Sequence, residues 1–111
     1  LQYYSSGSKK VYEIVADIAM GINTSDNIGL VVGATKYQEM KKLRESTSGL
    51  SWLIPGIGAQ GGDLKKSVII GNQDGVGIIN ISRGILYAGD GSLNAIEKAA
   101  QDYTSKMKKI I

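Results

Sequence analysis

A glycine-rich segment, residues 55–63, carries the clearest chemical potential in this chain. It follows an apolar run at 50–54 and precedes a helix-like run at 64–70, so we expect a loop between a strand and a helix. Glycines let a backbone approach a ligand closely, and free N–H groups at a helix start face anions. The pattern therefore predicts an anion site, although a glycine pattern alone fits a connection without a ligand equally well.

A second run, residues 77–85, carries an arginine beside a glycine near its end. Arg83 is one of only two arginines in the chain, and we expect it where a buried strand gives way to its loop. The planar guanidinium group suits phosphate oxygens. Arg83 is therefore a candidate phosphate ligand, and the alternative role is a surface ion pair.

Composition excludes several kinds of chemistry. The 111 residues include no cysteine and no histidine, which removes disulfides, thiol nucleophiles, histidine bases and the usual zinc ligands. The net charge of +3 comes from dispersed lysines, and no arginine or aromatic residue is interleaved with them to indicate nucleic-acid binding. No apolar run reaches the roughly 18 residues of a membrane helix. We expect a cytoplasmic protein without metal, membrane or nucleic-acid partners.

Apolar runs recur along the chain, and each is followed by a helical pattern. The runs at 28–34, 50–54 and 75–81 are continuous, which predicts strands buried on both faces, as in a parallel sheet. Asp63 and Ser92 are candidate helix N-caps. The apolar stripes expected to face the core are Val11, Ile14, Val15, Ile18 and Ala19, then Tyr37, Met40 and Leu43, then Leu64 and Val68, and finally Leu93, Ile96, Ala100, Tyr103 and Met107.

This order, a helix followed by three strand–helix units, predicts parallel strands in sequence order. Two α/β architectures fit: an open doubly wound sheet and an arc of a closed (β/α)8 barrel. In both, a functional site lies at the C-terminal ends of the strands, where residues 33–35, 55–63 and 82–84 fall. A barrel takes about 250 residues, so the barrel architecture requires further polypeptide. Because Leu1 is not a methionine, we expect the natural protein to start elsewhere.

Four segments, in this order and spacing, resemble orotidine 5′-phosphate decarboxylase, above all its longer bacterial type. They are residues 28–35, 43–45, 55–63 and 82–88. The sequence Pro-Gly-Ile-Gly-Ala-Gln-Gly-Gly-Asp at 55–63 is highly specific, and the resemblance runs over nearly the whole chain. It implies that residues 1–111 are a single partial domain: about three βα units and a preceding helix, from the C-terminal part of a (β/α)8 barrel.

The resemblance also implies a function for the full-length protein. That protein would be a carboxy-lyase converting orotidine 5′-phosphate to uridine 5′-phosphate and CO2 in de novo pyrimidine biosynthesis, as a homodimer without metal or organic cofactor. Gln60 and Arg83 would bind the substrate phosphate, assisted by the backbone N–H of Ser82. The remaining residues of the expected substrate loop are Pro55, Gly58, Ala59 and Gly61.

The chain also departs from the family pattern. The family's catalytic lysine and aspartates lie in its N-terminal half, and no such aspartate–lysine–aspartate set is present here. Lys41, Lys42, Lys65 and Lys66 are expected on solvated helix faces. We therefore expect no catalytic residue in this segment and no activity from it alone. Two alternatives stay open: a non-catalytic phosphate- or nucleotide-binding α/β module, and a fragment that associates through exposed strand edges.

Overall fold

The computed structural model describes residues 5–6, 9–34, 36–57 and 63–111. Its elements, in chain order, are β1 (Ser5–Ser6), β2 (Lys9–Lys10), α1 (Val11–Ile22), β3 (Gly29–Val31), α2 (Tyr37–Ser46), β4 (Ser51–Ile54), α3 (Leu64–Gly71), β5 (Gly77–Ile79), α4 (Arg83–Leu86) and α5 (Leu93–Ile110). The four longer helices and the three longer strands were all expected from the sequence. The antiparallel pair β1–β2 and the short helix α4 were not.

Strands β3, β4 and β5 form a parallel sheet in that order, as predicted. Leu30 of β3 is the partner of Trp52 in β4, and Leu53 of β4 is the partner of Ile78 in β5. The ladder is tight, since the backbone N–H of Trp52 donates to the Val76 carbonyl at 2.8 Å. Within the described residues, β3 and β5 are both edge strands.

Only one face of this sheet is covered within the described residues. Along β4, Trp52 and Ile54 are buried, whereas Leu53 is exposed; on the same uncovered face, Val31 is 71% and Ile78 56% exposed. The prediction of burial on both faces is therefore wrong for this part of the chain. The reason is that α2 and α3 pack on the same side. A doubly wound sheet carries helices on both faces, whereas a barrel carries them only outside, so the arrangement matches an arc of a barrel.

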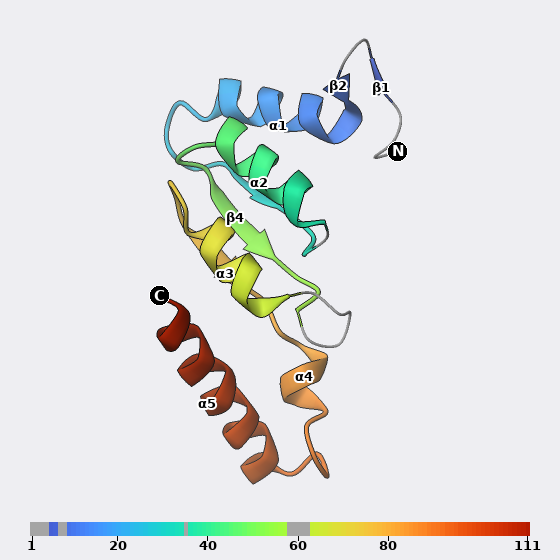
Figure 1. Ribbon diagram of the computed structural model, residues 1–111, viewed down its shortest axis with the longest axis vertical. Helices are drawn as coiled ribbons and strands as arrows, with labels where there is room; N and C mark the ends of the chain where they lie inside the picture. Colours follow the sequence, from blue (N-terminus) through green and yellow to red (C-terminus); the bar gives the residue numbers. More distant parts are fainter. Residues whose placement is uncertain (1–4, 7–8, 35, 58–62) are drawn as a thin grey trace.

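The core lies between this covered face and helices α2 and α3. Its buried apolar members are Val32, Met40, Trp52, Ile54, Ile57 and Ile70. The stripes expected on α1 and α5 are less buried than predicted, because Val15 and Ile18 are exposed and Leu93 is 85% exposed. Both helices lie toward the two ends of the described structure, as Figure 1 shows.

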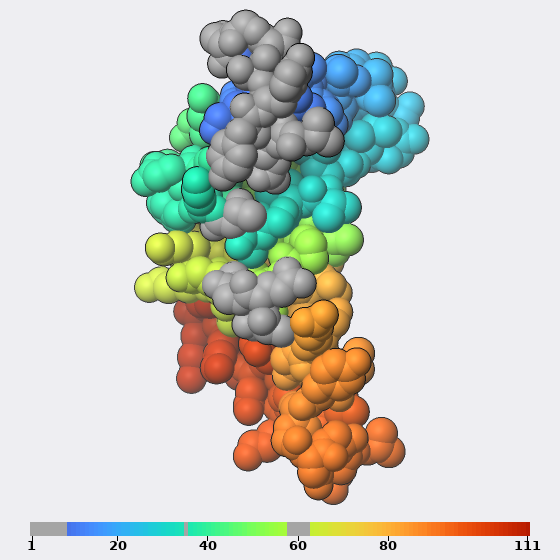
Figure 2. Space-filling view, turned by 90° about the vertical axis from the view of Figure 1, so that its right-hand side faces the viewer, coloured from blue at the N-terminus to red at the C-terminus, as the bar shows by residue number. Residues whose placement is uncertain are grey.

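The described molecule is elongated. Its principal extents are 50 × 29 × 21 Å and its radius of gyration is 15.7 Å, against about 13 Å for a compact domain of this length. Helices α1 and α2 lie at one end and α4 and α5 at the other (Figure 1), and Figure 2 shows the same succession of layers from another side. Such a shape suits one part of a larger, closed architecture.

A buried arginine holds the N-terminal ends of β4 and β5. Arg44, on α2, is 1% exposed. Its Nη1 donates to the Leu50 carbonyl at 2.6 Å, its Nε to the Gln73 carbonyl at 2.6 Å and its Nη2 to the Gly71 carbonyl at 2.9 Å. These carbonyls end α3 or precede the two strands, so Arg44 joins α2, β4, α3 and β5. In a barrel, the end that holds the N-termini of the strands contributes stability, whereas ligands bind at the end that holds their C-termini.

Candidate functional site

The C-terminal ends of β3, β4 and β5 meet at one edge of the sheet, because the strands are parallel. Backbone pairing continues past the strand ends there. The N–H of Ala34 donates to the Pro55 carbonyl at 3.4 Å, and the N–H of Asn80 donates to the Ile54 carbonyl at 3.0 Å. The end of β4 and Pro55 are thus paired on one side with the segment after β3 and on the other with the segment after β5.

The glycine-rich segment has a fixed beginning. Pro55 directly follows β4, as predicted, and is half-buried. Gly56 has a φ of +89°, a left-handed conformation that favours glycine. Ile57 is buried in the core cluster. These contacts anchor the chain up to the point where the expected substrate loop begins.

The end of the segment is also fixed. Asp63 is the N-cap of α3, and its carboxylate accepts from the Lys66 backbone N–H at 2.9 Å, which confirms the predicted cap. Gly58, Ala59, Gln60 and Gly61 lie outside the described residues, so their roles remain predictions. The loop that contains them therefore runs from a buried isoleucine to a capped helix start.

Arg83 follows strand β5, as expected, although the strand is shorter than the apolar run at 75–81. β5 ends at Ile79, and Arg83 is the first residue of α4, with Ser82 at its N-cap. The Asn80 N–H still donates to the carbonyl of Ile54, the last residue of β4, and Gly56 then takes a left-handed conformation. The Ser82 carbonyl accepts from the Leu86 N–H at 2.8 Å, so the turn that presents Arg83 is internally bonded.

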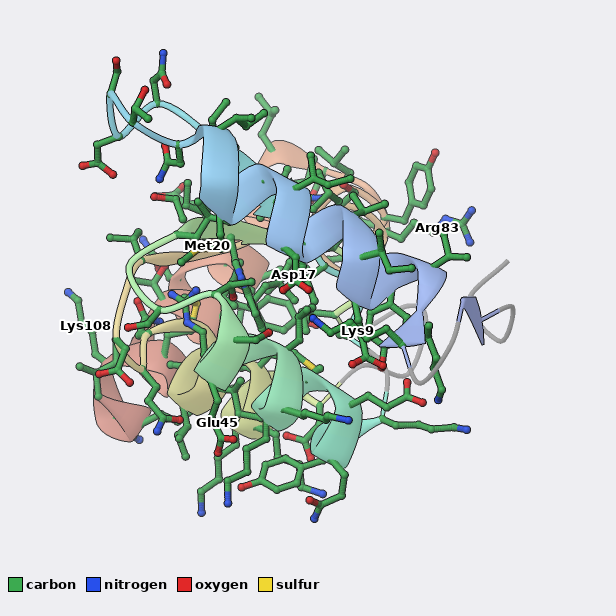
Figure 3. The ribbon with its side chains drawn as sticks, turned by 90° about the horizontal axis from the view of Figure 1, so that it is seen from above. Lys9, Asp17, Met20, Glu45, Arg83 and Lys108 are labelled. Carbon is green, nitrogen blue, oxygen red and sulfur yellow. The ribbon has the colours of Figure 1, made fainter. Side chains whose placement is uncertain are left out.

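The Arg83 side chain is exposed and, among the described residues, forms no ion pair. Figure 3 shows it projecting outward from the molecule. The alternative role for Arg83, a surface ion pair, is therefore not seen among the described residues. An exposed guanidinium beside the first turn of a helix is suited to an anionic ligand.

No set of three acidic side chains that could hold a metal ion occurs among the described residues. Lys41, Lys42, Lys65 and Lys66 are exposed on α2 and α3, as expected. An apolar groove of about 310 Å³ lies between α1, α2 and β3, and Arg83 is not part of its lining. Of the helices described, none is long and apolar enough to cross a bilayer.

Comparison with known proteins shows to which proteins this chain is similar. No family model matches the chain. A protein of Dehalococcoides mccartyi named orotidine 5′-phosphate decarboxylase is 55% identical over 91 residues, which cover 80% of this chain and 34% of that protein. The chain is homologous to part of the orotidine 5′-phosphate decarboxylase family. A Haloarcula marismortui protein of the same name is 41% identical over 111 residues, covering 94% of this chain and 40% of its own length.

Solved structures of this family share the fold. The Leishmania donovani OMP decarboxylase matches 99% of this chain and 41% of its own, with a TM-score of 0.83 and 33% identity. The Leishmania donovani UMP synthase matches 99% of this chain with a TM-score of 0.80 and 36% identity. The described structure is thus part of a (β/α)8 barrel, as predicted. The chain spans between a third and two-fifths of the length of the two curated decarboxylases compared.

The sequence missed two contacts behind the candidate site. Asn80 donates from Nδ2 to the Ser82 hydroxyl at 3.4 Å, and Tyr103 of α5 lies against Gly84 of α4. Tyr103 was expected only as a member of the apolar stripe on the last helix. The glycine directly after Arg83 was the signal available, since a glycine inside a helix often marks a close approach of another group.

Proposed function

We propose that Gln60, Ser82 and Arg83 form the phosphate-binding part of an orotidine 5′-phosphate decarboxylase, which converts orotidine 5′-phosphate to uridine 5′-phosphate and CO2. The single observation that carries the proposal is the exposed Arg83 at the start of α4, after β5, in a chain 55% identical over 91 residues to a protein of that name. The full-length protein is, in this proposal, a cytoplasmic, cofactor-independent homodimer of pyrimidine biosynthesis. Residues 1–111 are its C-terminal part.

Each proposed ligand has a distinct task. The Arg83 guanidinium forms charge-assisted hydrogen bonds with the substrate phosphate, and the backbone N–H of Ser82 adds a donor. Gln60 reaches the same phosphate from the loop after β4. The structure supports the first two tasks, because Ser82 and Arg83 begin α4 and the start of a helix leaves backbone donors free.

The loop after β4 closes over the bound phosphate in this proposal. Pro55 packs beside the substrate at the base of the loop, and Gly58, Ala59 and Gly61 give the loop the freedom to close. The residues on either side of the loop are fixed, because Ile57 is buried in the core and the Asp63 carboxylate caps α3. Binding energy from a phosphate remote from the reacting bond can drive such a closure and support the chemistry there.

The chemistry itself is assigned to residues outside this chain. Decarboxylation in the family uses a lysine and aspartates that have no counterpart here, by the resemblance described above. The segment therefore supplies binding energy and loop closure and, by itself, no reacting group. The isolated chain is expected to show no turnover.

The test is an ultraviolet assay of orotidine 5′-phosphate decarboxylation by the full-length protein that contains these residues. Absorbance loss in proportion to protein concentration is the expected result, with the isolated 111-residue chain as the inactive control. Binding of uridine 5′-phosphate without turnover would favour the alternative, a phosphate- or nucleotide-binding module without catalysis. A folded full-length protein that shows no binding and no turnover would refute the proposal.

A further inference from the structure

Helix α5 makes an unusually close contact with the turn that carries Arg83. A Cβ atom placed on Gly84 would lie 2.7 Å from the Tyr103 hydroxyl oxygen and 3.3 Å from Tyr103 Cζ. Real Cβ atoms essentially never come within 3.0 Å of another residue's heavy atoms. The outer end of the tyrosine ring therefore rests directly on the backbone of the residue that follows Arg83.

A second side chain crowds the same side of Gly84. The same Cβ would lie 3.2 Å from Cγ2 of Ile81, and Ile81 packs against the apolar core cluster. The space beside Gly84 is thus bounded by a side chain packed on the core and by the ring of Tyr103. The missing side chain of Gly84 is what allows both neighbours to come so close.

A second glycine contact fixes α5 relative to this segment. A Cβ on Gly89, which has a φ of +55°, would lie 3.2 Å from Cβ of Ala95 in the first turn of α5. That turn is itself capped, because the Ser92 hydroxyl accepts from the Ala95 N–H at 3.2 Å. Helix α5 therefore holds both ends of the segment from Gly84 to Gly89, so the position of Tyr103 is well defined.

We propose that Tyr103 is a positioning residue for the phosphate site: by resting on Gly84 it sets the place and direction from which Arg83 and the Ser82 N–H meet the phosphate. This inference rests on the proposed function. Arg83 forms no ion pair among the described residues, so its backbone is the part that the fold can orient. Small misplacements of a binding group cause large losses of affinity and rate.

The test compares two ligands that differ only in the phosphate, uridine 5′-phosphate and uridine, by competition calorimetry on the full-length protein. The variants are Tyr103→Ala, Tyr103→Phe and Gly84→Ala. Thr104→Ala is the matched control, since Thr104 is exposed on the next position of α5 and its hydroxyl only donates to the Ala100 carbonyl at 2.9 Å. Thermal unfolding of each variant verifies that it is folded.

The expected result is a loss of roughly tenfold in uridine 5′-phosphate affinity for Tyr103→Ala and for Gly84→Ala, a smaller loss for Tyr103→Phe, and unchanged uridine affinity throughout. If Tyr103→Ala does not fold, the other two variants carry the comparison. Unchanged affinity in the variants, or equal losses for both ligands, would overturn the inference while leaving the proposed function intact. A wild-type protein that binds both ligands equally would overturn the phosphate site and this inference together.

Discussion

The guanidinium group of Arg44 lies over the indole ring of Trp52, with Cζ 4.6 Å from the ring centroid. The indole N–H of Trp52 also has a partner, because it donates to the Thr47 hydroxyl at 3.2 Å. A buried cation is tolerated only when it is paired with suitable acceptors. Here an aromatic face and several backbone carbonyls supply them, so the charge of Arg44 stabilises the junction of α2 with β4 and β5. Burial lowers the Arg44 pKa from its ordinary value, and Asp74 opposes this shift.

Replacing Arg44 with methionine should destabilise the protein without affecting the phosphate site. The substitution keeps much of the volume but leaves the carbonyls of Leu50, Gly71 and Gln73 without their donor. We expect a loss of about 3 kcal/mol in the free energy of unfolding of the full-length protein, measured by urea denaturation. An Arg44→Met variant as stable as the wild type would show that the guanidinium makes no net contribution to the free energy of unfolding.

Gly75→Ala should cause a similar defect through the same arginine. A Cβ at Gly75 would collide with Nη2 of Arg44 and would lie 3.1 Å from the Leu50 carbonyl. We expect a lower midpoint of urea unfolding, and less than additive effects when Gly75→Ala is combined with Arg44→Met, because both act on one contact. Gly21→Ala in helix α1 is the control: nothing lies within 4 Å of its added Cβ, so it should stabilise by about 0.5–1 kcal/mol.

Arg83→Ala should have the opposite profile from Arg44→Met. Because Arg83 is exposed and unpaired by any described acid, the unfolding midpoint should not change. Loss of charge-assisted hydrogen bonds should weaken uridine 5′-phosphate binding by roughly 10- to 100-fold. Arg83→Lys should recover only part of the affinity, since lysine lacks the planar fork. Calorimetry on the full-length protein measures both, and equal affinity in all three forms would contradict the assignment.

The carboxylate of Asp90 should titrate below its ordinary value of 3.8. The hydrogen bond from the Ser92 side chain is the largest cause of the lowered pKa, followed by the bond from the Ser92 backbone N–H at 3.0 Å. Because the folded pKa is lowered, the stabilisation is present above the ordinary pKa and is lost as pH falls through the folded one. Ser92→Ala should raise the Asp90 pKa toward its ordinary value. An NMR titration of the Asp90 carboxyl carbon measures both, and an unshifted Asp90 in the wild type would contradict the expectation.

The isolated 111-residue chain should associate with itself. Val31 and Ile78 expose apolar side chains on the uncovered sheet face, and β3 and β5 have free edges, which favour pairing with further chains. We expect the mass measured by sedimentation equilibrium to rise with concentration. The double substitution Val31→Lys with Ile78→Lys should suppress the rise, whereas a concentration-independent monomer before substitution would show that the exposed face is not adhesive.

The sequence was sufficient for much of the fold. Continuous apolar runs predicted parallel strands in sequence order, and the caps at Asp63 and Ser92 followed from local chemistry. Strand β5 ends at Ile79, two residues before the end of the apolar run at 75–81 from which it was predicted, because strand length depends on the partner strand. One-sided burial was also missed, since a residue such as Val31 has the same type whether it faces helices or the interior of a barrel.

The candidate site was predicted in part. The sequence placed Pro55 after one strand and Ser82 and Arg83 after the next, and in the structure they follow β4 and β5, whereas their roles stay predictions. The sequence did not predict that Arg44 is buried and Arg83 exposed, because a charged residue is normally expected at the surface. The position of Arg44 on the buried side of α2, four residues after Met40 and three before Thr47, was the available signal. Contacts between distant elements, such as Tyr103 with Gly84, depend on helix packing that no local pattern encodes.

The two arginines of the chain lie at opposite ends of the same strands. Arg44 bonds the segments that lead into β4 and β5, whereas Arg83 follows β5. Substitutions in the segments that follow the strands can therefore accumulate without disturbing the Arg44 contacts that hold the starts of the strands. Such a protein can change its ligand during evolution while its fold stays the same.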